Sequence, residues 1–134
     1  MEESHVVTCF VENSGKVLLL KRSGQVGSYQ QRWAGVSGYL ETNNTPLAQA
    51  FEELREEVAL YPADLAIEKE GDPLEVIDEK LGKKWIVHPF RFLLAQAGKI
   101  KTDWEHTEYR WVKPDDIEHY QTVPNLYEAW KRVQ

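Results

Sequence analysis

The segment of residues 38–60, GYLETNNTPLAQAFEELREEVAL, places four carboxylates within six positions of a predicted helix. Thr45 is a suitable N-cap and Pro46 suits the first helical position, so we expect a helix over Pro46–Leu60. Tyr61-Pro62 should end it. Apolar residues recur at helical spacing and give this helix one face that packs on a core. They are Leu47, Ala50, Phe51, Leu54 and Val58.

The acidic residues of this helix gather away from its apolar face. On a helical wheel Glu53 and Glu57 share a flank and Glu56 lies opposite the core, and each like-charge pair costs about 0.2–0.5 kcal/mol. Glu56 and Glu57 also lie near the C-terminus, where the macrodipole is already negative. One explanation is a solvated acidic face. The preceding Gly38 and its polar loop favour another, an oxygen-rich concavity that holds a hard divalent cation.

The same segment resembles the signature of the Nudix hydrolases, G-x5-E-x7-R-E-U-x-E-E-x-G-U, where U is a bulky aliphatic residue. Three positions differ: Asn44 replaces the first glutamate, Glu52 the arginine and Ala59 the second glycine. Aligning Arg55 with the arginine would lose the paired glutamates, so we keep the frame that starts at Gly38. In this frame six of nine defined positions match, namely Gly38, Glu53, Leu54, Glu56, Glu57 and Leu60.

The resemblance covers most of the chain. VVTCFVENSGKVLLLKRS resembles the opening hairpin of the family, WAGVSGYLE the strand before the signature loop, and EHTEYRWVKPDDI the late strand before the closing helix. The resemblance implies an α/β fold, a Nudix-type α/β/α sandwich with a mixed β-sheet, formed by a single domain over residues 1–134.

Hydrophobic periodicity predicts elements that fit such a fold. Short connections between interleaved strands and helices also indicate an α/β sandwich with a mixed sheet. Residues 61–83 are less regular, and we interpret Lys69–Asp72 and Asp78–Lys83 as loops around a short strand. The expected strands are His5–Val11, Lys16–Arg22, Trp33–Gly38, Leu74–Ile77, Lys84–Leu94 and His106–Val112, and the expected helices are Pro46–Leu60 and Asn125–Val133.

Composition narrows the class of protein. A chain of 134 residues with 42% hydrophobic content fits one globular domain. We find no apolar run near 18 residues and no leader at the N-terminus, so we expect no membrane span or signal peptide and a cytoplasmic location. The single cysteine, Cys9, excludes an internal disulfide and lies in an apolar run, which favours a buried thiol. A net charge of −6 argues against nucleic acid as the main partner.

The Nudix resemblance implies hydrolysis of a nucleoside diphosphate linked to another moiety, a small-molecule substrate, with Mg2+ or Mn2+ as the cofactor. It implies that Glu56 and Glu57 bind the metal and that Glu53 completes the shell or orients the water. The backbone carbonyl of Ser37 or Gly38 is a further candidate ligand. A homodimer is left open.

Two candidate sources of the general base are left open. Glu53 is the first. The second is an acidic residue from a late loop, where family members often place one, and here the candidates are Glu105 and Glu108.

Side chains outside the signature supply candidate substrate contacts. Arg22 and Arg32 are cations near the signature strand, although such residues are often only surface residues. Tyr29 and Trp104 lie in polar loops, and a nucleobase that stacks on such a ring gains about 1–3 kcal/mol. Packing is the alternative for both rings. His106 lies near the expected site but lacks a metal-ligand spacing partner, so zinc is not expected.

A second function class is a Nudix-fold nucleotide-binding or regulatory module that has lost turnover. It is suggested by Asn44 and Glu52, which replace charged residues that position the catalytic glutamates in the family. A third explanation, a purely structural acidic helix, predicts no tight metal site. The sequence contains no pattern that identifies the substrate.

Overall fold

Two long strands form the centre of the fold in the computed structural model, which describes all residues from 1 to 134. β1 (Glu2–Asn13) and β7 (Lys83–Leu94) run parallel, in register from Glu2 opposite Lys83 to Glu12 opposite Leu93. β4 (Val36–Tyr39) pairs antiparallel with β1. β5 (Leu65–Glu70) and β6 (Leu74–Asp78) pair antiparallel with β7.

A second group of strands is built on β2 (Lys16–Arg22), which pairs antiparallel with β3 (Trp33–Ala34) and β8 (His106–Val112). The β1–β2 hairpin joins the two groups through Ser14 and Gly15, whose φ angles of 52° and 78° suit a two-residue hairpin turn. All eight strands belong to one sheet with parallel and antiparallel pairs, so the predicted mixed sheet is confirmed.

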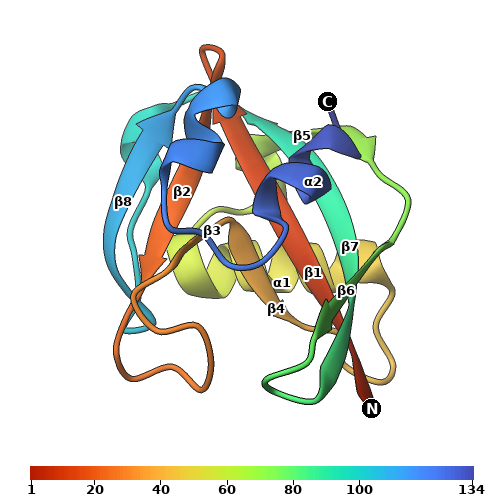
Figure 1. Cartoon of the computed structure of the whole chain (residues 1–134). Helices are drawn as coiled ribbons and strands as arrows, with labels where there is room; N and C mark the ends of the chain where they lie inside the picture. Colours follow the sequence, from red (N-terminus) through yellow and green to blue (C-terminus); the bar gives the residue numbers. More distant parts are fainter.

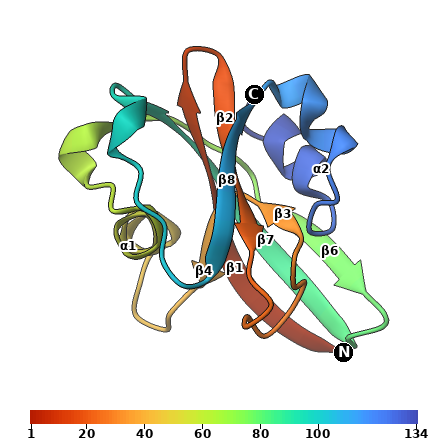
Figure 2. The ribbon, with the colours of Figure 1, turned by 90° about the vertical axis from the view of Figure 1, so that its left-hand side faces the viewer.

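The helices lie on both faces of this sheet, as Figures 1 and 2 show: α1 (Pro46–Val58) covers one face and α2 (Leu126–Lys131) the other. Thr45 caps α1, because its side-chain oxygen accepts a hydrogen bond from the Ala48 N–H at 3.1 Å. None of the helices combines the length and the apolar character needed to cross a membrane. Short 3-10 turns lie at Pro62–Asp64 (η1), Ala97–Lys99 (η2) and Pro114–His119 (η3).

Alternation along the strands divides the core into two halves. On β1, Cys9 belongs to the half that packs against α1, whereas Phe10 belongs to the half that packs against α2. Phe10 meets Trp130 of α2 edge to face, with ring centroids 5.4 Å apart. Burial raises the pKa of the Cys9 thiol well above its ordinary value, and the buried thiol expected from the sequence is confirmed.

Several predicted boundaries were wrong. The predicted strand Trp33–Gly38 is two strands that meet at Gly35, where a Cβ atom would lie 2.7 Å from the Cys9 carbonyl oxygen. The chain changes partner there from β2 to β1. The strand β5 lies where we expected irregular structure, because its sequence LAIEKE is mostly exposed and gives little hydrophobic signal.

Both predicted helices extend too far. α1 ends at Val58, because Ala59 takes a left-handed conformation with φ 57° and its N–H bonds back to the Arg55 carbonyl oxygen. α2 covers only Leu126–Lys131 of the predicted Asn125–Val133, and Asn125 caps it with φ 61°.

Candidate active site

The carboxyl group of Glu53 lies directly against the backbone of Gly38. Gly38 is in β4, and a Cβ atom at this position would clash with the Glu53 carboxyl group. Glycine therefore leaves room for the Glu53 carboxyl group against β4, and a larger residue at this position would displace that carboxyl group. Burial raises the pKa of Glu53 above its ordinary value, although hydrogen bonds from Glu57 and Gln49 act in the opposite direction.

Glu57 is the buried carboxylate of the site. Its exposed fraction is 2%, and its Oε2 atom has no hydrogen-bond partner. Burial raises its pKa well above the ordinary value, and the adjacent carboxyl group of Glu53 raises it further. An unsatisfied buried polar group costs about 1–3 kcal/mol, and more when it is charged, so this arrangement calls for a ligand or a proton.

His106, the first residue of β8, contacts the same carboxyl group. Its Nε2 atom lies 3.4 Å from Glu57 Oε1, and its Nδ1 atom lies 3.0 Å from Asp103 Oδ1. Burial lowers the pKa of His106. The sequence predicted that His106 lies near the site but did not predict its contact with Glu57, because this contact depends on how β8 packs against α1.

Glu56 points into solvent. Its Oε1 atom lies 3.4 Å from Arg55 Nη2, and both side chains are exposed. The structure thus brings the carboxyl groups of Glu53 and Glu57 together, whereas the carboxyl group of Glu56 is exposed to solvent. In this arrangement no three His, Cys, Asp or Glu side chains already surround a common point that would hold a metal ion.

A cavity of about 440 Å3 adjoins these carboxylates. Six predicted site residues line it: Arg22, Tyr29, Ser37, Gly38, Trp104 and Glu105. The Arg22 guanidinium donates two hydrogen bonds to the Ser28 carbonyl oxygen, at 3.1 and 2.9 Å. Trp104 is 64% exposed, so its indole is available at the mouth of the cavity. Burial and the charge of Asp103 raise the pKa of Glu105.

Five predicted site residues are not part of the cavity lining: Glu53, Glu56 and Glu57 of α1, together with Arg32 and Glu108. Arg32 is exposed and is not part of the lining. Glu108 pairs with Arg110, whose Nη2 atom lies 2.9 Å from Glu108 Oε1. Arg110 in turn packs over the ring of Trp33 at 5.3 Å. Glu108 therefore lies with Arg110 and Trp33 on the side of the sheet that faces α2, away from Glu53 and Glu57, and the structure does not support it as a base. A register irregularity between β2 and β8 separates it from His106, which faces α1.

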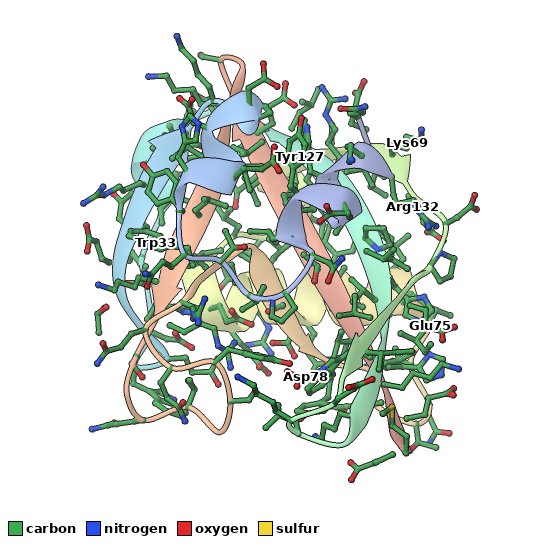
Figure 3. All side chains as sticks on the ribbon, in the orientation of Figure 1. Trp33, Lys69, Glu75, Asp78, Tyr127 and Arg132 are labelled. Carbon is green, nitrogen blue, oxygen red and sulfur yellow. The ribbon has the colours of Figure 1, made fainter.

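Tyr29, for which we considered both stacking on a ligand and packing, has a hydroxyl group that is held by two partners. Its hydroxyl donates to Asp78 Oδ2 at 2.7 Å and accepts a hydrogen bond from Trp85 Nε1 at 3.0 Å. Burial and the bond to Asp78 raise the pKa of Tyr29 to about 12. Figure 3 labels Asp78, which ends β6, and the contact joins the loop after β2 to the β6–β7 hairpin. Tyr29 therefore holds one wall of the cavity.

A cation and two rings line another part of the cavity. The Lys83 ammonium lies 4.6 Å from the centre of the Trp85 ring and 5.5 Å from that of Tyr39. The two rings are 5.9 Å apart. Tyr39 is 55% exposed and can stack on a planar ligand, whereas Trp85 is buried and has the Lys83 ammonium over its ring. Sequence reasoning missed this group because its members come from β4 and β7.

A family model described as the NUDIX domain matches residues 3–132. The chain belongs to the Nudix family. Among its relatives is the nucleoside triphosphatase NudI of Escherichia coli O139:H28, which is 24% identical over 125 residues, or 90% of this chain and 89% of that protein. A stretch of 55 residues is 42% identical to the RNA pyrophosphohydrolase of Halorhodospira halophila, covering 41% of this chain and 28% of that protein.

Solved Nudix structures share the fold. A MutT protein from Methanosarcina mazei Go1 matches with a TM-score of 0.82 at 21% identity, over 98% of this chain and 93% of that chain. A C. elegans Ap4A hydrolase matches with a TM-score of 0.77 at 17% identity, over 98% and 94%. The predicted Nudix sandwich is confirmed, and the family and its named relatives confirm the predicted enzyme class, a Nudix-type hydrolase.

Two of the three Nudix signature positions that differ in this chain, Asn44 and Glu52, contact each other. Asn44 Nδ2 donates to Glu52 Oε2 at 3.1 Å, so the replaced glutamate and arginine positions are joined by a hydrogen bond between an amide and a carboxylate. Asn44 Nδ2 also donates to Gln49 Oε1 at 2.8 Å. Gln49, which the sequence analysis did not single out, contacts Glu53 in turn.

Nudix hydrolases generally use divalent metal ions. The side chains of this site fit such an ion, because hard cations prefer carboxylate oxygens and the buried Glu57 Oε2 lacks any protein partner. Glu53 adds a second carboxylate next to Glu57. Glu56 needs a rotation of its exposed side chain to join them.

Proposed function

We propose that this chain is a hydrolase that uses Mg2+ or Mn2+ to cleave the diphosphate linkage of a nucleoside diphosphate joined to another moiety. The observation that carries the proposal is the adjacent pair of carboxylates, buried Glu57 and half-buried Glu53, near a cavity with aromatic and cationic walls. Two adjacent carboxylates with little access to water repel each other unless a cation or a proton lies between them.

Each group of residues has a distinct part in this proposal. Glu57, Glu53 and Glu56 hold the metal, with the carbonyl oxygen of Ser37 or Gly38 as a further ligand. When bound, the ion neutralises charge on the diphosphate oxygens and makes water a better nucleophile. Glu53 or Glu105 then orients the attacking water and accepts its proton.

The remaining cavity residues bind the substrate. Arg22 faces the anionic phosphates, while the exposed rings of Trp104 and Tyr39 provide surfaces for a nucleobase. We propose that residues 1–134 act as a single Nudix domain on a small nucleotide-type molecule.

A binding module without turnover is the second candidate. Asn44 and Glu52 favour it, because they remove two charged residues that position the catalytic glutamates in the family. The hydrogen bonds among Asn44, Glu52 and Gln49 favour the enzyme, because a different set of contacts stands where the two charged residues stand in the family.

A substrate screen separates the two candidates. Nucleoside triphosphates, ADP-ribose, dinucleotides and nucleotide sugars are incubated with the protein and either Mg2+ or Mn2+, and monophosphate or phosphate release is measured. We expect one class of compound to be hydrolysed, and EDTA to stop the reaction.

Variants identify the source of the activity. Glu57→Gln should abolish it, whereas Glu68→Gln, on exposed β5, should retain the parent rate. Saturable nucleotide binding without any release would support the binding module instead. Equal rates in Glu57→Gln and the parent would show that the carboxylate pair is not the catalytic centre.

A further inference from the structure

Gln49 is a completely buried polar side chain on the side of α1 that carries Glu53, one turn before it and away from the apolar face. Its exposed fraction is 0%, and its neighbour Ala50 belongs to the core between α1 and the sheet. Glutamine is seldom fully buried, and a buried amide needs hydrogen-bond partners. The partners of Gln49 therefore indicate why an amide stands there.

The direction of the Gln49 amide follows from its contacts. The backbone N–H of Glu41 lies 3.0 Å from Oε1, and a backbone N–H can only donate. Asn44 Nδ2 lies 2.8 Å from the same oxygen. The amide oxygen is thus occupied by two donors, so the NH2 group must be the end that reaches Glu53 Oε1, at 3.0 Å.

These bonds form a continuous path to the candidate catalytic group. The path runs from Glu52 through Asn44 and Gln49 to Glu53, and its first two members are two of the three residues that differ from the Nudix signature. On its other side the Glu53 carboxyl group abuts Gly38. Glu53 is therefore held between a backbone and an amide, with its Oε1 atom bonded to Gln49.

We propose that Gln49 is the positioning residue for Glu53. Its hydrogen bonds take the place of the glutamate and the arginine of the Nudix signature, which are Asn44 and Glu52 in this chain. This inference rests on the proposed hydrolase function, since it assigns Gln49 its importance through Glu53. The competing explanation is that Gln49 only fastens the loop before α1 through Glu41 and Asn44.

The test compares Gln49→Met with Gln49→Glu. Methionine has a similar length but makes none of the bonds. Glutamate keeps an acceptor for Glu41 and Asn44 but loses the donor to Glu53. If Gln49 positions Glu53, both variants should lower kcat by about 10–100-fold with KM within about threefold, and both should weaken Mn2+ binding by about tenfold, as changes beside metal ligands typically do.

Asn13→Leu is the matched control. The Asn13 amide donates to the Leu94 carbonyl oxygen at 2.7 Å, far from Glu53 in the sheet, so its loss removes a partly buried amide bond without touching the site. We expect Asn13→Leu to lower Tm by a similar amount to Gln49→Met while kcat and Mn2+ affinity stay within twofold of the parent.

A rescue measurement completes the test. In the Asn44→Glu, Glu52→Arg background, which restores the signature charges, Gln49→Met should lower kcat by at most threefold, because the arginine can orient Glu53.

Parent-like kcat and Mn2+ affinity in both single variants would overturn the inference and leave Gln49 a loop anchor. If the parent binds Mn2+ but hydrolyses nothing, the hydrolase proposal fails, and the Mn2+ affinities of the two variants still decide the role of Gln49.

Discussion

At the scale of single residues, Glu57 is held where burial disfavours its charge. Its folded pKa lies above the value of 4.5 expected for a free glutamate, so the folded protein binds this proton more tightly than the unfolded chain does. The resulting stability is fully present below about pH 4.5 and is lost as the pH rises through the folded pKa. At neutral pH, without metal, the buried carboxylate destabilises the fold.

Glu57→Gln should therefore stabilise the metal-free protein. In EDTA at pH 7 we expect its Tm to exceed that of the parent by about 3 °C or more, and the difference should shrink towards pH 4. Added Mn2+ should raise the Tm of the parent but not that of the variant. Scanning calorimetry measures both effects. Glu56→Gln is the control, since the exposed Glu56 should not affect the Tm in EDTA.

Ala59 is a second residue in an unfavourable state, because its backbone is left-handed and its side chain has a Cβ atom. It adopts φ 57°, where a Cβ atom costs about 1–2 kcal/mol. Ala59→Gly should stabilise the protein by about 1 kcal/mol in urea unfolding, because glycine adopts this conformation freely. Ala48→Gly, at an exposed position inside α1, should instead destabilise by about 1 kcal/mol. Destabilisation by both changes would contradict the left-handed helix end.

The general base is a further question for single residues. Glu53→Gln should lower kcat by about 100-fold or more and remove the low-pH limb of the pH–rate profile, because a general base must be deprotonated to act. Glu108→Gln should behave like the parent, because Glu108 pairs with Arg110 outside the cavity. Glu105→Gln decides between the remaining candidates. If only this variant loses the low-pH limb while Mn2+ affinity is unchanged, the base is Glu105 and Glu53 serves the metal.

At the scale of elements, the sequence predicted best those strands and helices whose own residues show a clear hydrophobic or capping pattern. The strands Lys16–Arg22 and His106–Val112 and the start of α1 at Pro46 agree with the structure to the residue. The strand β5 was missed because its place is set by pairing with β7 rather than by its mostly exposed side chains.

The loop between β2 and β3 is an element whose position depends on distant contacts. Tyr29 joins it to Asp78 and Trp85, and Arg22 holds the carbonyl oxygen of Ser28. These bonds fix the loop as a wall of the cavity even though Tyr29 has φ 50°, which is uncommon for a residue other than glycine.

Tyr29→Phe should free this loop while leaving the ring in place. We expect KM to rise by about 3–10-fold with kcat within about twofold, because the lost contacts support substrate binding rather than the reaction step. Hydrogen exchange of the loop should also accelerate. Tyr61→Phe, which alters an exposed phenol away from the cavity, should change neither quantity. A loss of kcat with unchanged KM would show that the loop acts on the reacting groups instead.

At the scale of the whole molecule, the candidate site combines a local part with a long-range part. Gly38, Glu53 and Glu57 lie within one contiguous segment, and their spacing alone pointed to a metal site. The contacts of Glu57 with His106 and of Tyr29 with Asp78 require β6 and β8 to be in place. Single-sequence spacing carries no information about such contacts.

The parallel pairing of β1 with β7 also determines when the molecule can form during its synthesis. Eleven residue pairs join the first strand to a strand that begins at Lys83, so Glu2 has no partner until more than half of the chain has left the ribosome. Contacts between residues so distant in sequence close slowly. A nascent chain that stops before β7 lacks the strand on which the apolar side chains of β1 and α1 pack, and such exposed apolar surface makes a partly synthesised chain prone to aggregation.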